Sequence, residues 1–231
     1  MHFHLPKPLH GCREFAGEVG IIFLGVLIAL GAEQLVETIH WRHQVRAERE
    51  ALDNDVQGMW AAMSGRQIIQ ACVDRRLGDL ALVFARHEQG KPLGIIAPIG
   101  RPGVWTGETS ALQMASADGT LAHMSFEEKN RYFGVQSSYE TFEPAAYEER
   151  DSWRVLQALD DPGGIDQQDW HDLRKAYRDA VDSNRIMKAD LVTGPEGAWF
   201  NPFVGIKGLH PNKGALTLWM VRALCAPAVK P

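Results

Sequence analysis

The chain has 231 residues, of which 45% are hydrophobic and 23% charged, a balance that excludes intrinsic disorder as the main state. Its 24 Lys and Arg against 29 Asp and Glu leave a net charge of −5, which argues against a nucleic-acid binder working through a basic surface. Three cysteines exclude a disulfide-dense miniprotein and a Cys-rich metal framework. Composition therefore predicts a folded protein with a sizeable core and no nucleic-acid partner.

An uncharged apolar run near the N-terminus predicts a membrane-spanning helix. Residues 19–32 carry no charge and are bracketed by Glu18 and Glu33. This run alone is short for a span, which needs about 20 residues, but its apolar flanks extend the stretch to 15–36. We therefore expect a transmembrane helix over 15–36, preceded by a tail of residues 1–14.

A cleavable signal peptide is the alternative interpretation of the same segment. Lys7 and Arg13 form a basic region before the apolar run, and Ala29-Leu30-Gly31 is similar to a signal-peptidase site. The helical periodicity continues past this site without a break, which favours a retained anchor.

The N-terminal segment also carries a set of short motifs. They are Lys7-Pro8-Leu9-His10-Gly11, Glu14-Phe15, Gly17 through Ile22, and Gly25 through Gln34. Over residues 5–42 they resemble the opening of a family of uncharacterised bacterial single-pass inner-membrane proteins, and beyond that point the likeness is only general. The resemblance implies a cytoplasmic N-terminus, one anchor in the lipid bilayer of the inner membrane and a periplasmic helical domain. It implies no activity and no catalytic residue.

Downstream of the anchor, apolar residues at three- and four-residue spacing predict helices. The pattern predicts a stalk, which is also the first bundle helix, over 37–88, and seven Gly and Pro residues predict a loop over 89–106. We expect residues 107–231 to complete an antiparallel bundle of about four or five helices. The predicted fold class is all-α, with the anchor continuing into the stalk and a periplasmic bundle.

Capping and breaking residues set the expected bounds of four helices in this last part. The bounds are Gly107–Asp118; the capping box at Ser125 to Pro162, with a bend at Pro144; Asp166 to Gly194; and Lys213–Cys225. The second helix is expected to bury Tyr132, Tyr139, Phe142, Trp153 and Leu156. The seam of the third is Trp170, Leu173, Tyr177, Val181, Asn184, Met187 and Leu191.

Two features of the anchor are candidates for function. Glu18 and Glu33 place carboxylates near the ends of the span, where such groups either serve an ion path or reach water at the interface. Gly25, Ala29 and Ala32 form a small-residue face that lets two membrane helices approach closely. We expect an interfacial role for the carboxylates and self-association through the small-residue face, although small residues are also common in spans.

A carboxylate and two imidazoles, Glu37, His40 and His43, are weak candidates for a metal site just outside the membrane. Steps of three residues drift by about 60° each around a helix, so the outer two side chains diverge. Polar residues at the membrane interface beside Trp41 are the favoured interpretation. The sequence calls for no metal and no cofactor.

Three aromatic side chains, Trp199, Phe200 and Phe203, lie close together in a segment without helical periodicity. They predict either a partner-docking surface or a loop packed over the bundle. The second is favoured because exposed aromatic patches are uncommon in stable proteins.

The three cysteines divide between the two sides of the anchor. Cys12 precedes it, whereas Cys72 and Cys225 follow it. An oxidising periplasm tends to pair two thiols, so we predict a disulfide between Cys72 and Cys225; two separate buried thiols are the alternative.

No enzyme signature is present, since the chain has no phosphate-binding glycine loop, nucleophile elbow or paired-histidine zinc motif. We therefore expect a non-catalytic membrane-anchored scaffold, accessory subunit or sensor that binds a protein or ligand, within a homo-oligomer or an envelope complex. The alternative is a transport or energy-coupling component using Glu18 in oligomerised anchors. A metal-dependent enzyme is a weaker alternative.

Overall fold

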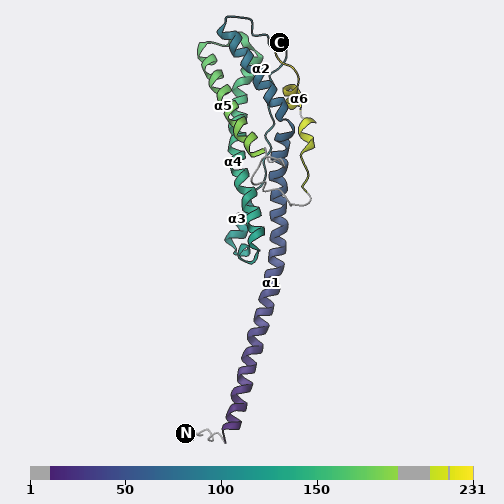
Figure 1. Cartoon of the computed structure of the whole chain (residues 1–231), viewed down its shortest axis with the longest axis vertical. Helices are drawn as coiled ribbons and strands as arrows, with labels where there is room; N and C mark the ends of the chain where they lie inside the picture. The colour runs from purple at the N-terminus through teal and green to yellow at the C-terminus, as the bar shows by residue number, and fades with distance from the viewer. Residues whose placement is uncertain (1–10, 192–208, 218, 231) are drawn as a thin grey trace, which may run out of the picture. The chain divides into compact units, whose positions relative to one another are not determined.

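The computed structural model describes residues 11–191, 209–217 and 219–230, and within these ranges the protein is all-α, as predicted (Figure 1). The α-helices are α1 (Cys12–Ile68), α2 (Gln70–Glu88), α3 (Ser110–Ala117), α4 (Phe126–Leu156), α5 (Gln167–Leu191) and α6 (Trp219–Cys225). Short 3-10 segments cover Thr120–His123, Gln157–Asp160, Pro162–Gly164 and Lys213–Thr217. The described ranges contain no β-strand, only an isolated antiparallel bridge between Ile95 and Val229.

The chain divides into two compact units, Met1–Glu48 and Arg49–Pro231. The described part of the first unit is almost entirely the first part of α1. Among the described helices, α1 alone is long and apolar enough to cross a membrane, judged by length and composition. None of its most apolar window is buried, and Ile21 and Val36 are 75% and 68% exposed. The predicted apolar helix is therefore present, and no other described residue covers its most apolar window.

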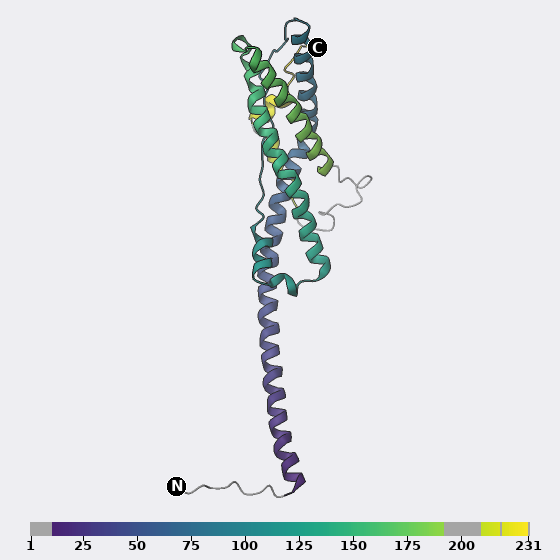
Figure 2. The same cartoon turned by 90° about the vertical axis from the view of Figure 1, so that its left-hand side faces the viewer.

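The second unit, which we call the head, is built around a helix pair. α4 and α5 pack against each other along their lengths, while α2 packs on both α5 and α6 (Figure 2). Each buried aliphatic or aromatic side chain contributes about 1.5–3 kcal/mol to folding, so this packing is the main source of stability. The largest fully buried apolar side chains are Trp153, Tyr139, Phe142, Leu52, Ile69, Leu80, Ile99, Leu156, Leu159 and Leu173.

Local sequence signals place the start of α4 correctly. The Glu128 amide donates to the Ser125 hydroxyl at 3.2 Å, and the Ser125 amide donates to the Glu128 carboxylate at 3.2 Å, which completes the predicted capping box. All five residues expected to face inward from this helix are buried. Asp166 likewise accepts a hydrogen bond from the Asp169 amide at 2.8 Å at the start of α5. Caps and apolar periodicity are local properties, which is why they could be predicted.

The predicted continuous helix over the stalk is wrong, because it breaks at Ile69. The backbone there has φ −94° and ψ 0°, and the Ile69 carbonyl accepts from both the Cys72 and Val73 amides. Ile69 is fully buried, so the break lies inside the core. Apolar spacing runs through this position unchanged, and periodicity therefore gave no sign of it.

Three further helices are shorter than predicted. α4 ends at Leu156, where a 3-10 segment begins, instead of continuing to Pro162. α3 begins at Ser110 instead of Gly107, and the Gly107 amide donates to the Tyr139 hydroxyl at 2.7 Å. A Cβ at Gly107 would lie 2.5 Å from the Met59 amide nitrogen, so only glycine fits this approach of two backbones. At the C-terminal end, the predicted helix over Lys213–Cys225 is a 3-10 segment followed by α6, which starts at Trp219.

Candidate functional site

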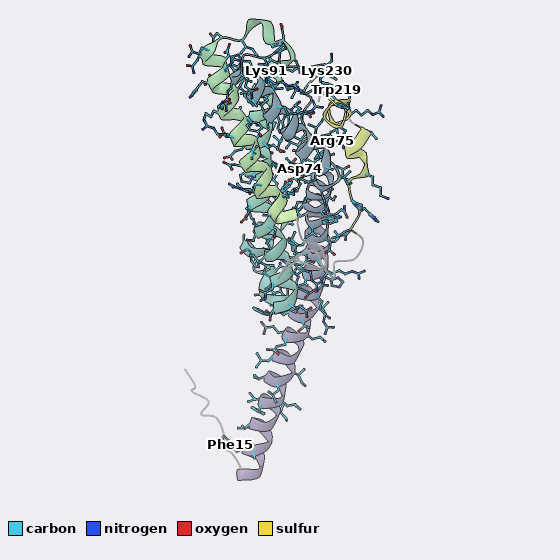
Figure 3. The ribbon with its side chains drawn as sticks, turned by 45° about the horizontal axis from the view of Figure 1, so that its top comes forward. Phe15, Asp74, Arg75, Lys91, Trp219 and Lys230 are labelled. Carbon is cyan, nitrogen blue, oxygen red and sulfur yellow. A yellow bond between two sulfur atoms is a disulfide. The ribbon has the colours of Figure 1, made fainter. Side chains whose placement is uncertain are left out.

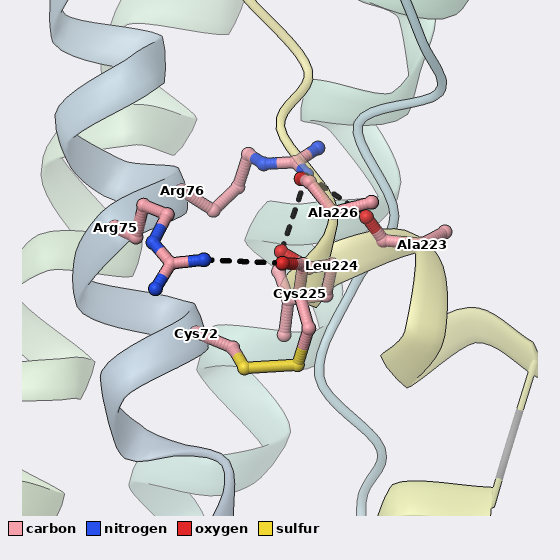
Figure 4. The surroundings of a disulfide bond; sticks show 7 residues. All are labelled: Cys72, Arg75, Arg76, Ala223, Leu224, Cys225 and Ala226. Carbon is pink, nitrogen blue, oxygen red and sulfur yellow. Dashed lines mark hydrogen bonds between the residues drawn. A yellow bond between two sulfur atoms is a disulfide. The ribbon is translucent and has the colours of Figure 1, made fainter.

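A disulfide joins α2 to α6. Cys72 and Cys225 are bonded, with their Cα atoms 4.6 Å apart and 153 residues between them in sequence (Figure 4). The pairing is the one the sequence predicts, but the break at Ile69 places Cys72 at the beginning of α2 and not late in a stalk. The neighbouring Arg75 side chain donates to the Cys225 carbonyl at 3.2 Å. The C-terminal helix is thus fastened to α2 covalently.

A fully buried arginine reinforces this fastening. Arg76 donates to five backbone carbonyls, which we call the Arg76 clamp. The acceptors are Pro98 (2.9 Å) and Ile99 from the segment after α2, and Ala223 (2.9 Å), Leu224 (3.1 Å) and Ala226 (2.5 Å) from the C-terminal segment. Burial lowers the pKa of Arg76, while Asp79 and Asp160 oppose the shift, and a guanidinium stays protonated at neutral pH. The clamp therefore holds two distant segments through a buried charge.

A second buried arginine, Arg66 at the end of α1, is at the centre of a side-chain network. Its guanidinium donates to both carboxylate oxygens of Glu149 in α4, at 3.2 and 2.9 Å. It also donates to the Gln70 side-chain oxygen at 2.8 Å and to the Asn184 side-chain oxygen at 2.7 Å. We call these residues the Arg66 network. It links the end of α1 and the start of α2 to α4 and α5, and each of the three guanidinium nitrogens of Arg66 donates a hydrogen bond.

The network reaches the surface at Asp74. The Asn184 and Gln70 side-chain amides donate to one carboxylate oxygen at 3.1 and 2.8 Å, and Lys188 donates to the other at 2.9 Å. Burial raises the pKa of Asp74, but the hydrogen bonds from Lys188, Asn184 and Gln70 outweigh it, so the pKa lies below the usual value.

An open groove between α4 and α5 is the best candidate for a binding site. Its volume is about 840 Å³. Six carboxylates and one ammonium group line it: Glu148, Asp151, Asp169, Asp172, Asp179, Asp182 and Lys175. Its apolar lining residues are Val155, Ala158, Leu173, Ala176 and Ile186, and its two hydroxyls are Ser152 and Ser183. An apolar surface edged by negative charge suits a partner that combines an apolar group with positive charge.

The anchor candidates lie on the exposed surface of α1. Glu18, Glu33 and the small residues Gly25, Ala29 and Ala32 are all exposed in the first unit. A Cβ added at Gly25 would meet nothing within 4 Å, so this position has space within a single chain.

The three candidate metal ligands do not form a cluster. Glu37 accepts a hydrogen bond from the Trp41 indole at 3.3 Å, and His40 makes an edge contact with the same ring. No group of three or more His, Cys, Asp or Glu suited to a metal is found among the described residues. The aromatic candidates Trp199, Phe200 and Phe203 lie in 192–208, outside the described residues.

Sequence reasoning missed the buried charges of the head, although a signal for them exists. Arg66 follows Met59 and Met63 on the apolar face of α1, and Glu149 follows Phe142 and Ala145 on that of α4. A charged residue within an apolar helical stripe indicates a buried partner elsewhere, because an unpaired buried charge is costly.

Comparison of the chain with protein-family models, curated proteins and solved structures finds no match.

Proposed function

We propose that the protein is a non-catalytic scaffold or accessory subunit of the bacterial inner membrane. In this proposal α1 anchors the chain in the bilayer with the N-terminus in the cytoplasm, and the head acts in the periplasm by binding other envelope components. Anchored copies associate through the small-residue face of α1.

The observation that carries the proposal is the uncovered apolar surface of α1. Within two turns of the helix, Ile21, Phe23 and Ile28 are 75%, 64% and 63% exposed. A soluble monomer rarely leaves so large a continuous apolar surface in water, whereas a lipid bilayer covers it without cost. The Cys72–Cys225 disulfide supports the periplasmic position of the head, because such bonds persist in oxidising compartments.

The experiment tests location first. Full-length chain expressed in a bacterium should stay in the membrane after alkaline carbonate extraction. Alkaline phosphatase fused after Pro231 should be active, and a matched fusion to a reporter that works only in the cytoplasm should be inactive. The opposite pair of activities would overturn the periplasmic assignment, and release by carbonate would overturn the anchor.

Self-association is tested in the same membranes. Gly25→Leu should weaken association in a membrane two-hybrid assay, because a bulky side chain blocks close approach of two helices. The matched control is Leu27→Ala, which lies off the small-residue face. Equal behaviour of the two variants would show that the small residues are ordinary span composition.

A further inference from the structure

The acidic groove of the head has two serine side chains in its lining. Ser183 and Ser152 line the groove and are only 1% and 8% exposed. A serine hydroxyl can both donate and accept a hydrogen bond, so the floor of the groove offers polar groups to a partner.

The apolar lining of the groove is also uncovered. Val155 and Ile186, on α4 and α5, are 41% and 40% exposed. Two groove carboxylates, Asp151 and Asp182, pair with arginines of their own helices, at 2.8 Å in each case. Exposed pairs of this kind are weak, so the groove keeps a negative field that attracts a cationic surface.

A complementary surface exists on the same head. Trp219, the first residue of α6, is 73% exposed. Arg222 in the same helix and Lys213 in the preceding 3-10 segment are exposed as well. The last 35 residues contain four Lys or Arg and no Asp or Glu. This C-terminal surface thus combines one large exposed aromatic ring with positive charge; Figure 3 labels Trp219 and Lys230.

The two surfaces face away from each other. α4 and α5 lie on one side of the head and α6 lies on the other, with α2 between them (Figures 1 and 2). A single copy therefore cannot insert its own Trp219 into its own groove.

We propose that the α4–α5 groove receives Trp219 of a second copy of this chain. The indole ring packs on the exposed Val155 and Ile186 side chains, and its N–H donates to a groove hydroxyl. The positive charge around α6 faces the groove carboxylates. Because different surfaces of the two copies meet, the contact is heterologous. Repeated from copy to copy, it forms either a closed ring of subunits or an open row.

The contact is small and depends on the membrane. One indole ring buries about 150–250 Å², well below the roughly 1,200 Å² of a stable interface. Anchoring in one membrane raises the effective concentration of neighbouring heads, so a weak contact becomes populated. The inference thus rests on the proposed anchoring. Its test needs separate readouts for the anchoring in the membrane and for the contact between heads.

Site-specific photo-cross-linking in native membranes makes this separation. Trp219→benzoylphenylalanine in the full chain should yield, on irradiation, a dimer whose cross-linked peptide comes from α4 or α5 at the groove. The matched control is Phe133→benzoylphenylalanine, because Phe133 is a 49% exposed aromatic residue outside the groove. Carbonate extraction of the same membranes reports anchoring independently of the cross-link.

Charge reversal tests the proposed complementarity. Asp179→Lys, at a groove carboxylate with no ion pair among the described residues, should lower the dimer yield about fivefold or more. Adding Arg222→Glu to the same chain should restore part of the yield. Membrane-bound chain that gives no dimer, a cross-link to another part of the chain, or a cross-link to a different protein would each overturn the proposal.

Discussion

The two buried arginines of the head, Arg66 and Arg76, lie on either side of the helix break at Ile69 and use opposite kinds of acceptor. Arg66 is satisfied by side chains, above all by the Glu149 carboxylate, whereas Arg76 donates to backbone carbonyls. Side-chain acceptors can be exchanged together with the arginine, but carbonyls remain after any substitution. The Arg66 network should therefore be replaceable by an apolar pair, while the Arg76 clamp should have no compensating substitution.

The largest effect is expected from breaking the Arg66 network on one side. Glu149→Leu leaves the Arg66 charge buried without its carboxylate and should lower the free energy of unfolding by about 3–5 kcal/mol. Adding Arg66→Met should restore most of the loss, because an apolar pair of similar volume carries no desolvation cost. Chemical denaturation of the full chain in detergent, followed by circular dichroism, measures both. A loss below about 1 kcal/mol in the single variant would contradict the role of the pair.

The disulfide gives the Arg76 end of the head a covalent fastening that the Arg66 end lacks. Replacing both cysteines, Cys72→Ser and Cys225→Ser, should cost about 2–4 kcal/mol, because the unfolded chain regains the entropy of a long closed loop. Denaturation of the reduced wild-type chain provides the matched comparison and should give the same midpoint. Two free thiols in protein isolated from its own membrane would show that the bond does not form.

Removing the Arg76 clamp should lower the free energy of unfolding less than removing the disulfide does, but it should clearly loosen the C-terminal segment. Arg76→Met keeps the apolar stem but leaves carbonyls without donors, and we expect a loss of about 2 kcal/mol. Hydrogen exchange in residues 219–230 should become faster, since this segment then loses the three hydrogen bonds that Arg76 donates to it. Arg75→Met is the matched control, because Arg75 is exposed and makes one bond to Cys225. If a second, apolar substitution restored the full free energy of unfolding of Arg76→Met, the proposed difference between the Arg66 network and the Arg76 clamp would be wrong.

The smallest effect concerns acid sensitivity at the exposed end of the Arg66 network. The pKa of Asp74 is lower in the folded chain than in the unfolded chain, where it is about 3.9. Its contribution to stability is therefore complete above that value and is lost as pH falls through the folded pKa. Asp74→Asn should flatten the pH dependence of the unfolding free energy below about pH 4.

Part of this acid sensitivity should remain in Asp74→Asn. Burial raises the pKa of Glu128, but its hydrogen bonds to Ser125 and its pairing with Arg49 outweigh this and lower it, so it acts in the same direction. An unchanged slope in Asp74→Asn would show that the Asp74 contacts contribute nothing to folding.

Local patterns determined the helical content, the apolar stretch of α1, the caps at Ser125 and Asp166, and the buried face of α4, because each depends on residues three or four apart. The cysteine positions likewise determined which two thiols could pair across the head. The break at Ile69 was not visible, since the apolar stripe passes through it unchanged.

Only the tertiary structure decided the partners of the polar groups. Arg66 meets Glu149 across 83 residues, and the Arg76 clamp joins segments about 150 residues away. The groove exists because α4 and α5 pack side by side, which brings Ser152 and Ser183 together in its lining. Such pairings depend on how helices pack in space, and no short-range pattern encodes that packing, because an apolar stripe specifies that a face is buried but not what it is buried against.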